Sequence, residues 1–189
     1  TMLIARAQLD DGAAQQEIYR RHAGAVFRRL TCLVGADEER EDLLQQVFSD
    51  LFAGLSRFRG DAMLRTYVYR IATNVAYDHL RRRSRRRRIF GGGGDDDDIA
   101  ERAAEQRSPE SMAALQEQLQ AVWRYLERLA PKKRIALVLR VCEGLSLEEI
   151  GEQVGARVST VAKRIKYARE ELIEMIRRER RRELRRLLK

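Results

Sequence analysis

Residues 57–88 read RFRGDAMLRTYVYRIATNVAYDHLRRRSRRRR, a stretch that mixes aromatic and basic side chains. Gly60 permits a turn, Asp61 can cap a helix by accepting a backbone N–H, and no Gly or Pro follows until Gly91. We therefore expect one long helix that begins at about Ala62. Its apolar residues recur every three or four positions and predict a buried stripe of Leu64, Val68, Ile71 and Val75.

The other faces of this helix carry side chains that suit nucleic acid. They are Arg65, Tyr69, Arg70, Thr73, Asn74 and Tyr77. Guanidinium groups bind phosphates, rings stack on bases, and an amide can pair with a base edge. The composition indicates a nucleic-acid surface, although aromatic residues at helical spacing also fit a packed core and an arginine run also fits a solvated face.

Charge is distributed unevenly along the 189 residues. Residues 1–90 carry 17 basic and 11 acidic side chains, residues 91–112 carry 2 and 7, and residues 113–189 carry 19 and 11. The acidic segment opens with four glycines and four aspartates, which disfavour a helix through backbone entropy and charge repulsion. Two basic bodies therefore flank an acidic connector.

The fold class indicated is all-α, because helical periodicity runs through both basic bodies and the chain holds only two prolines. We expect two small helical domains, residues 1–88 and 113–189, joined by a flexible acidic Gly/Asp-rich linker over residues 89–112. As a random coil this linker spans about 27 Å, and pulled straight it reaches about 80 Å. The domains could then hold sites about two DNA turns apart.

Two more helices are expected in the first domain. One runs from Ala13 to Leu33 and ends at Gly35, and the next covers roughly 38–55 with Asp37 as its cap. The apolar face of the latter comprises Leu43, Leu44, Val47, Phe48, Leu51 and Leu55. Its polar face comprises Glu41, Asp42, Gln45, Gln46 and Asp50. This acidic face is hard to reconcile with DNA contact; it fits protein docking, and it also fits a plain solvated face.

The second domain contains a helix-turn-helix pattern. It is preceded by an apolar stripe of Leu115, Leu119, Val122, Leu126 and Leu129, with Trp123 beside it. Pro131 then starts a helix that has Cys142 inward and ends at Gly144. Ser146 opens a capping box and Gly155 supplies the turn. The buried stripe of the following helix comprises Val158, Val161, Ile165, Ala168 and Leu172.

The second helix of such a motif enters the major groove through its N-terminal half. The candidate readers are Ser159, Thr160, Ala162, Lys163, Arg164, Lys166 and Tyr167. Basic side chains among them can bind phosphate, guanine or both. A helical hairpin with a glycine turn fits the same pattern without any role in DNA binding. The arginine-rich continuation from Arg177 to Lys189 fits either a solvated helix end or a functional extension.

The sequence carries no catalytic constellation: no metal-ligand spacing, no phosphate-binding glycine loop and no nucleophile with a base. We expect no enzyme, no cofactor and no metal. Cys32 and Cys142 are expected as buried, reduced thiols rather than as metal ligands or a disulfide, and His22 and His79 as helix-surface residues. No apolar run approaches the roughly 20 residues that span a bilayer, and the start lacks a signal-peptide core. A cytoplasmic protein without membrane insertion is expected.

The order of these motifs resembles the extracytoplasmic-function (ECF) sigma factors, the small promoter-recognition subunits of bacterial RNA polymerase. Phe58 to Asp61, Leu64 to Asn74 and Asp78 to Arg83 match words of the family's region 2, and the helix-turn-helix stands where the family has region 4. Tyr67 takes a position at which the family more often has Trp, so a flat ring is kept.

The resemblance implies a role for each region. Region 2 would capture a flipped base and melt the minus-ten element through Gly54, Phe58, Arg59, Arg65, Tyr67, Arg70, Ile71 and Asn74. Region 4 would recognise the minus-thirty-five element through Ser159, Thr160, Lys163, Arg164, Lys166 and Tyr167. The clamp helices of the polymerase largest subunit would meet Asp42, Leu43, Gln45, Gln46 and Phe48. The implied partners are core RNA polymerase, promoter DNA and, as for many family members, an inhibitory anti-sigma factor.

Two other classes of function stay open on the sequence alone. An autonomous regulator that binds duplex DNA as a dimer through residues 145–176 would explain the helix-turn-helix but not the aromatic and basic helix. A helical enzyme acting on nucleic acid lacks any candidate catalytic set. A sigma factor is expected to co-elute with core polymerase and to be monomeric when free, whereas the regulator would be a stable dimer indifferent to polymerase.

Overall fold

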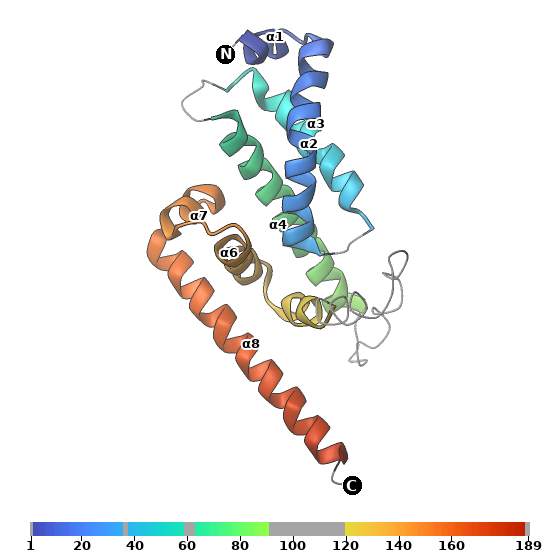
Figure 1. The fold of residues 1–189 in the computed structure, drawn as a ribbon, viewed down its shortest axis with the longest axis vertical. Helices are drawn as coiled ribbons and strands as arrows, with labels where there is room; N and C mark the ends of the chain where they lie inside the picture. Colours follow the sequence, from blue (N-terminus) through green and yellow to red (C-terminus); the bar gives the residue numbers. More distant parts are fainter. Residues whose placement is uncertain (1, 36–37, 59–62, 91–119, 188–189) are drawn as a thin grey trace.

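The computed structural model describes residues 2–35, 38–58, 63–90 and 120–187, and within these ranges every regular element is an α-helix (Figure 1). The elements in chain order are α1 (Met2–Gln8), α2 (Gly12–Val34), α3 (Arg40–Leu55), α4 (Leu64–Phe90), a helical segment over 120–128, α6 (Pro131–Cys142), α7 (Leu147–Val154) and α8 (Val158–Leu187). The expected all-α class is confirmed. Of the expected linker, Ile89 and Phe90 continue α4, and the remainder lies outside the described residues.

The first domain is built from α2, α3 and α4, which lie side by side along most of their length (Figure 1). Helical periodicity places an apolar stripe of each helix toward the other two, where it is removed from water. The most deeply buried members are Ile18, Val26, Leu30, Leu33, Val47, Leu51, Leu55, Val68 and Ala72. All six apolar residues predicted for the inner face of α3 are buried, so that face is confirmed.

Local signals set the ends of α2. The Asp11 carboxylate accepts N–H bonds from Ala13 and Ala14 at 3.0 and 3.1 Å, which satisfies two donors at the helix start. The Arg6 side chain donates to Asp11 at 2.7 Å and, with these backbone bonds, lowers the pKa of the Asp11 carboxyl. At the other end Gly35 has φ of 85°, which only glycine adopts without strain, and its N–H donates to the Thr31 carbonyl.

Two side chains of α4 lie inside rather than on the surface. The expectation that His79 is a surface residue is wrong, because it is only 4% exposed and its Nδ1 lies 3.3 Å from a carboxylate oxygen of Glu39. Thr73, also predicted for an exposed face, is buried and donates its hydroxyl to the Tyr69 carbonyl at 2.8 Å. The residues expected to cap α3 and α4, Asp37 and Asp61, lie outside the described ranges.

The second domain contains the helix-turn-helix, formed by α7 and α8 and packed on α6. The predicted capping box is confirmed: Ser146 Oγ accepts the Glu149 N–H at 3.1 Å, and the Glu149 carboxylate accepts the Ser146 N–H at 2.7 Å. Gly155 takes the left-handed conformation with φ of 61°. Gly151 lies against the turn, where a Cβ would sit 2.7 Å from the Ala156 carbonyl oxygen. Helix α7 therefore lies close to the turn that precedes α8.

Three residues that we expected to be buried in this domain are exposed. Val122 is 52% exposed, because the 120–128 segment turns Trp123 and Leu126 inward instead. Val158 is exposed because it is the first residue of α8, ahead of the part that packs on α6 and α7. Cys142 is exposed because it is the last residue of α6.

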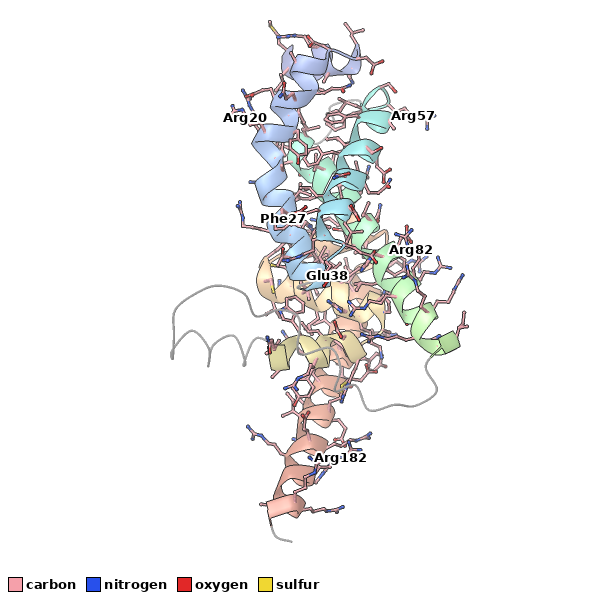
Figure 2. All side chains as sticks on the ribbon, turned by 90° about the vertical axis from the view of Figure 1, so that its right-hand side faces the viewer. Arg20, Phe27, Glu38, Arg57, Arg82 and Arg182 are labelled. Carbon is pink, nitrogen blue, oxygen red and sulfur yellow. The ribbon has the colours of Figure 1, made fainter. Side chains whose placement is uncertain are left out.

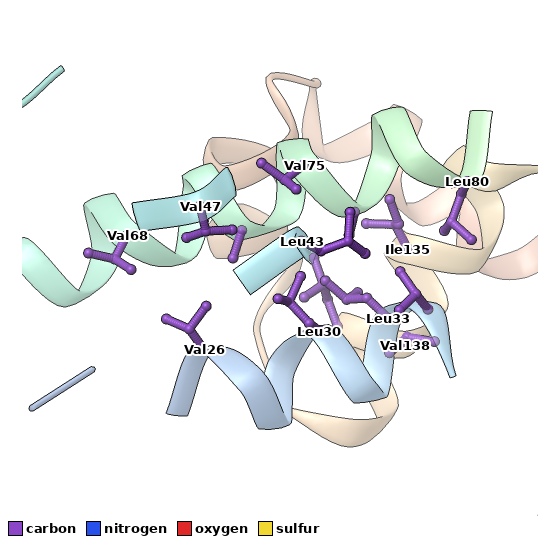
Figure 3. Close-up of a cluster of buried hydrophobic side chains, with 14 of the residues drawn as sticks. Val26, Leu30, Leu33, Leu43, Val47, Val68, Val75, Leu80, Ile135 and Val138 are labelled. Atoms are coloured by element: carbon purple, nitrogen blue, oxygen red, sulfur yellow. The ribbon is translucent and has the colours of Figure 1, made fainter. Parts of the chain in front are cut away.

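The two domains pack against each other in one continuous core. Helices α6 and α7 contact α2 and α4, and we call this contact the domain interface. Figure 3 shows Ile135 and Val138 of α6 among Leu30, Leu33 and Leu80 of the first domain. Figure 2, turned by 90°, shows the end of α8 with Arg182 extending beyond this body.

Candidate nucleic-acid interface

Four of the residues predicted for base capture lie together around the ring of Tyr67. We call Gly54, Phe58, Tyr67 and Arg70 the tyrosine cluster. The Phe58 and Tyr67 rings have centroids 5.1 Å apart at 33°, and the Arg70 guanidinium lies 5.4 Å from the Tyr67 centroid. The Tyr67 hydroxyl fits against Gly54 so closely that a Cβ there would be 2.7 Å from it. Residues from α3, the following turn and α4 thus form one surface.

Helix α1 fixes the position of Phe58. The Gln8 amide donates to the carbonyl of Leu55 at 3.0 Å and to the carbonyl of Phe58 at 2.9 Å. These two bonds pin the turn that follows α3, and Phe58 N–H bonds back to the Leu55 carbonyl at 3.0 Å. A half-buried ring on a pinned turn is preorganised for contact with a ligand. Arg59, predicted as a neighbouring contact, lies outside the described residues.

The remaining predicted residues of α4 continue this surface toward the domain interface. Arg65 is exposed and its guanidinium lies 6.0 Å from the Tyr69 centroid, whereas Ile71 is half-buried in the core side of the helix. Asn74 is exposed, two turns beyond Tyr67. It lines a cavity of about 290 Å³ that it shares with Arg164 of α8 and Lys132 of α6. Asn74 therefore does not join the tyrosine cluster but lies where the two domains meet.

Most of the predicted readers of α8 face solvent. Ser159, Lys163, Lys166 and Tyr167 are exposed, whereas Thr160 and Arg164 are half-buried. Lys166 is 3.9 Å from Glu170, a long and exposed ion pair that adds little stability and leaves the ammonium group accessible. The first three turns of α8 therefore present both positive charge and hydroxyl groups.

On α3, the residues predicted for polymerase contact divide into two groups. Asp42, Gln45 and Gln46 are exposed on one face. Leu43 and Phe48 are buried, and the Phe48 ring packs 4.6 Å from the Tyr19 ring, so neither offers its side chain to a partner on this surface. Their contribution is to hold the exposed face in place.

Sequence reasoning missed a buried arginine at the domain interface. Arg29 is 4% exposed; it donates to a Glu143 carboxylate oxygen at 2.8 Å, to the Thr73 hydroxyl at 3.1 Å and to the Gln153 side-chain carbonyl, and it lies over the Tyr69 ring. Burial lowers the pKa of Arg29 and raises the pKa of Glu143, and the charge of each partner opposes that effect. The spacing of Arg29 in the sequence could have indicated its burial, since Arg29 follows Val26 by three residues and therefore falls in the buried stripe.

A second set of contacts joins the domains further along α2 and α4. Arg134 Nε donates to the Leu33 carbonyl at 2.9 Å, and its guanidinium lies 5.5 Å from the Trp123 ring, which rests on Gly35. The Glu127 carboxylate pairs with Arg83 and Arg87 at 3.2 and 2.9 Å. Charge-assisted and apolar contacts thus hold the two domains together.

Comparison with known proteins assigns both domains. Residues 18–86 match the family model of Sigma-70 region 2, and residues 119–172 match that of Sigma-70, region 4. The chain is 32% identical over 171 residues to the RNA polymerase sigma-H factor of Pseudomonas aeruginosa, covering 89% of both proteins. It is 30% identical over 172 residues to the ECF RNA polymerase sigma-E factor of Escherichia coli, covering 89% of this chain and 90% of that protein. This chain belongs to the ECF sigma factors.

Two solved structures share the fold. A structure of CnrH in complex with the cytosolic domain of CnrY gives a TM-score of 0.61 at 23% identity, covering 93% of this sigma factor and 95% of that chain. The sigma factor RpoE of Bartonella quintana, solved with the anti-sigma factor NepR, gives a TM-score of 0.60 at 22% identity, covering 86% and 96%.

Membership of the family establishes the general function. The sigma factor acts with core RNA polymerase at promoter DNA, directs promoter-specific initiation of transcription and is not an enzyme. In the described ranges no group of three or more His, Cys, Asp or Glu side chains gathers as a metal site would require. None of the helices described is long and apolar enough to cross a membrane.

Proposed function

We propose that the tyrosine cluster, with Arg65, Ile71 and Asn74 of α4, captures the minus-ten element of a promoter as single-stranded DNA. A protein that hydrolyses no nucleotide can open a duplex only by binding the open form better than the closed one. A base held on an aromatic surface offsets the few kcal/mol of lost stacking and pairing. The observation that carries the proposal is the contact between the ring of Phe58, on a turn held by Gln8, and the ring of Tyr67 on α4. The exposed Arg65 and Arg70 flank this ring pair.

Asn74 is proposed to read the identity of one base. An amide can pair with a base edge in two directions, whereas a methyl group cannot. Asn74 is exposed on the same helix as Tyr67, two turns away, so a strand that stacks on the tyrosine cluster can continue along α4 to reach it. Arg59 is included in the proposed strand path through its place in the family motif.

Permanganate footprinting tests this assignment. Phe58→Ala is expected to reduce thymine reactivity on a duplex promoter by roughly 5- to 150-fold, because stacking of a base on a ring is worth about 1–3 kcal/mol. Asn74→Ala is expected to reduce it less and to relax the preference for one base. Binding to core polymerase stays unchanged in both, and a promoter with a pre-melted bubble recovers most of the loss. Normal reactivity of both variants on duplex DNA would contradict the proposal.

The helix-turn-helix is proposed to recognise the minus-thirty-five element as duplex DNA, with region 4 spanning residues 113–189. The exposed Ser159, Lys163, Lys166 and Tyr167 can reach a major groove at the start of α8, and the half-buried Thr160 and Arg164 border the same surface. Loss of one phosphate contact is expected to lower the salt dependence of binding by about one unit, whereas loss of a base contact is expected to cost about 1–3 kcal/mol at one base pair.

The exposed face of α3 is proposed to dock on the clamp helices of the polymerase largest subunit, within a region 2 that spans residues 1–88. Asp42, Gln45 and Gln46 offer carboxylate and amide groups there, and Leu43 and Phe48 position them from the core. Gln46→Arg introduces a positive charge into this acidic face at an exposed position. It is expected to weaken co-elution with core polymerase at least tenfold while leaving the thermal unfolding midpoint unchanged.

We further propose that the chain works in the cytoplasm, is monomeric when free and is held inactive by an anti-sigma factor. The support for the inhibitor is that both structural relatives were solved with a bound partner, and for RpoE that partner is an anti-sigma factor. The alternative of an autonomous dimeric regulator finds no support in the comparisons.

A further inference from the structure

The two cysteines of the chain meet across the domain interface. Cys32 lies near the end of α2 in the first domain, and Cys142 is the last residue of α6 in the second. The packing of α6 on α2 brings them near each other, and Cys32 is close enough to influence the Cys142 thiol. Cysteines on opposite sides of the segment 91–119 are thus neighbours only because the two domains are packed together.

Neighbouring contacts hold the pair in register from both sides. Arg29, one turn before Cys32, pairs at 2.8 Å with Glu143, the residue next to Cys142. The carbonyl of Leu33, the residue after Cys32, accepts a hydrogen bond from Arg134 at 2.9 Å. Arg134 lies two turns before Cys142 in α6. A disulfide requires Cβ atoms about 3.5–4.5 Å apart and correctly oriented side chains. Because these contacts clamp α2 to α6 on both sides of the pair, we infer that side-chain rotation can bring the two sulfurs together.

The pair is accessible and is chemically free to react. Cys142 is exposed and Cys32 is half-buried, so a small oxidant reaches at least one sulfur. No metal cluster is formed by the His, Cys, Asp and Glu residues of the described part of the chain, which leaves no metal-ligand role there to compete with oxidation. Although Cys142 is exposed to solvent, partial desolvation where the domains meet, with the nearby Cys32 and Glu143, raises the pKa of its thiol. It therefore stays protonated at neutral pH, and its oxidation is expected to be slow.

We propose that Cys32 and Cys142 form a reversible disulfide that fastens the two domains together and switches off initiation by this sigma factor. A peroxide is the oxidant. One thiol is oxidised to a sulfenic acid as the O–O bond of hydrogen peroxide breaks and one water leaves. The second thiol attacks the sulfenic sulfur, the S–S bond forms and a second water leaves. The two thiols lose two electrons and two protons in total, and a thiol reductant restores both by exchange.

The consequence for transcription follows from distances and rests on the proposed function of the two regions. Asn74 of region 2 and Arg164 of region 4 line the same cavity of about 290 Å³. The two promoter elements, by their names, are centred about 25 base pairs apart, or roughly 85 Å at about 3.4 Å per base pair. A chain fastened in the packed arrangement cannot contact both elements at once, whereas a reduced chain can separate its domains.

The chemical part of the proposal is tested on the full chain with hydrogen peroxide as the probe. Monomeric wild type is expected to lose 2 Da and to yield one cross-linked peptide that joins Cys32 to Cys142, and dithiothreitol reverses both changes. Cys142→Ser, a change at an exposed position, abolishes the cross-link, and so does Cys32→Ser. Wild type in 6 M urea forms it at least tenfold more slowly, because the contacts are lost. A cross-link only between chains, or an equal rate in urea, overturns the proposal.

The regulatory part is tested with core polymerase and a promoter that reduced wild type transcribes. Peroxide-treated wild type is expected to lose at least tenfold in transcript yield and to recover it with dithiothreitol. Cys142→Ser keeps its full yield under both treatments. Full yield from a chain shown by mass to be oxidised overturns this switch. The proposed minus-ten and minus-thirty-five contacts are tested separately, in the reduced Cys142→Ser chain, which cannot form the disulfide. Failure of the switch is therefore distinguishable from failure of the proposed promoter contacts.

Discussion

At the scale of single residues, the contact between Gly54 and Tyr67 decides how well the tyrosine cluster is formed. A Cβ at position 54 would lie 2.7 Å from the Tyr67 hydroxyl, so the ring must move if any side chain is added. The ring also stacks with Phe58 and Arg70, and its displacement would disturb both contacts. A single methyl group can thus alter the whole surface.

We predict that Gly54→Ala lowers the free energy of unfolding by about 1–3 kcal/mol through overpacking and reduces promoter opening. Adding Tyr67→Phe removes the hydroxyl and is expected to restore much of both losses. Urea denaturation and permanganate footprinting give the two readouts. Gly24→Ala is the matched control: its Cβ would meet only the mobile end of Arg28 at 3.6 Å, and a glycine in mid-helix is replaced at a gain of about 0.5–1 kcal/mol. Equal effects at positions 24 and 54 would refute the contact as the cause.

Individual residues also show how far sequence reasoning reaches. The resemblance led to Gly54 and Phe58, but the packing of Tyr67 on Gly54 needs coordinates because the two residues belong to different helices. Arg29 and His79 were missed for a physical reason. A polar or charged residue in an apolar stripe is ordinarily assigned to the helix surface, and tertiary partners such as Glu143 for Arg29 and Glu39 for His79 make burial possible.

At the scale of elements, the helix-turn-helix depends on the close approach of α7 to the turn before α8. Gly151 is buried, and a Cβ there would lie 2.7 Å from a backbone oxygen of Ala156, which cannot rotate away as a side chain can. The Ala156 N–H also bonds to the Gly151 carbonyl at 3.0 Å. The geometry between the two helices is therefore set by this glycine.

We predict that Gly151→Ala lowers the free energy of unfolding by about 1–3 kcal/mol and weakens binding to duplex promoter DNA. Glu152→Ala changes the exposed neighbouring residue and should alter neither property by more than about 0.5 kcal/mol. Lys163→Ala should weaken DNA binding at unchanged stability and lower the salt slope by about one unit. Circular dichroism melts measure the stability of the three variants, and fluorescence-anisotropy titrations of the full chain measure their DNA binding. Tight DNA binding by the Gly151 variant would show that this approach is dispensable.

The elements were largely predictable because their signals are local. The capping box of Ser146 and Glu149, the turn at Gly155 and the start of α6 at Pro131 all involve residues within one turn of each other. Val122 and Val158 were misassigned because a periodic stripe does not reveal where packing against another helix begins. Helix periodicity gives the direction of a face, whereas burial depends on what covers it.

At the scale of the whole molecule, the packing of the domains was not predictable. It joins α2 and α4 to α6 and α7 through pairs such as Arg29 with Glu143 and Arg134 with the Leu33 carbonyl, and no local pattern links residues so far apart. The interface also contains buried polar atoms, Arg29 Nε and Glu143 Oε1, that find no hydrogen-bond partner within the described residues. Such atoms offset part of the stability of the contact and leave it able to open.

We predict that Glu143→Ala opens the domain interface, because it leaves the buried Arg29 guanidinium without its carboxylate. Loss of one partner of a buried pair costs about 3–5 kcal/mol, and the 20% exposure of the Glu143 side chain places the effect near the lower end. Glu143→Gln keeps an acceptor and should open the interface less. Small-angle X-ray scattering of the free chain should show a larger maximum dimension for Ala than for Gln or wild type. Identical scattering from all three would contradict the role assigned to this pair.

Trp123 is an intrinsic fluorescence probe of the domain interface. It is the one tryptophan in the sequence, and its indole rests on Gly35 across the domain interface. Separation of the domains transfers that indole from a protein surface into water, which shifts its emission to longer wavelength. Opening of the free chain, such as we predict for Glu143→Ala, can therefore be followed in real time by the shift in tryptophan emission, with no dye attached.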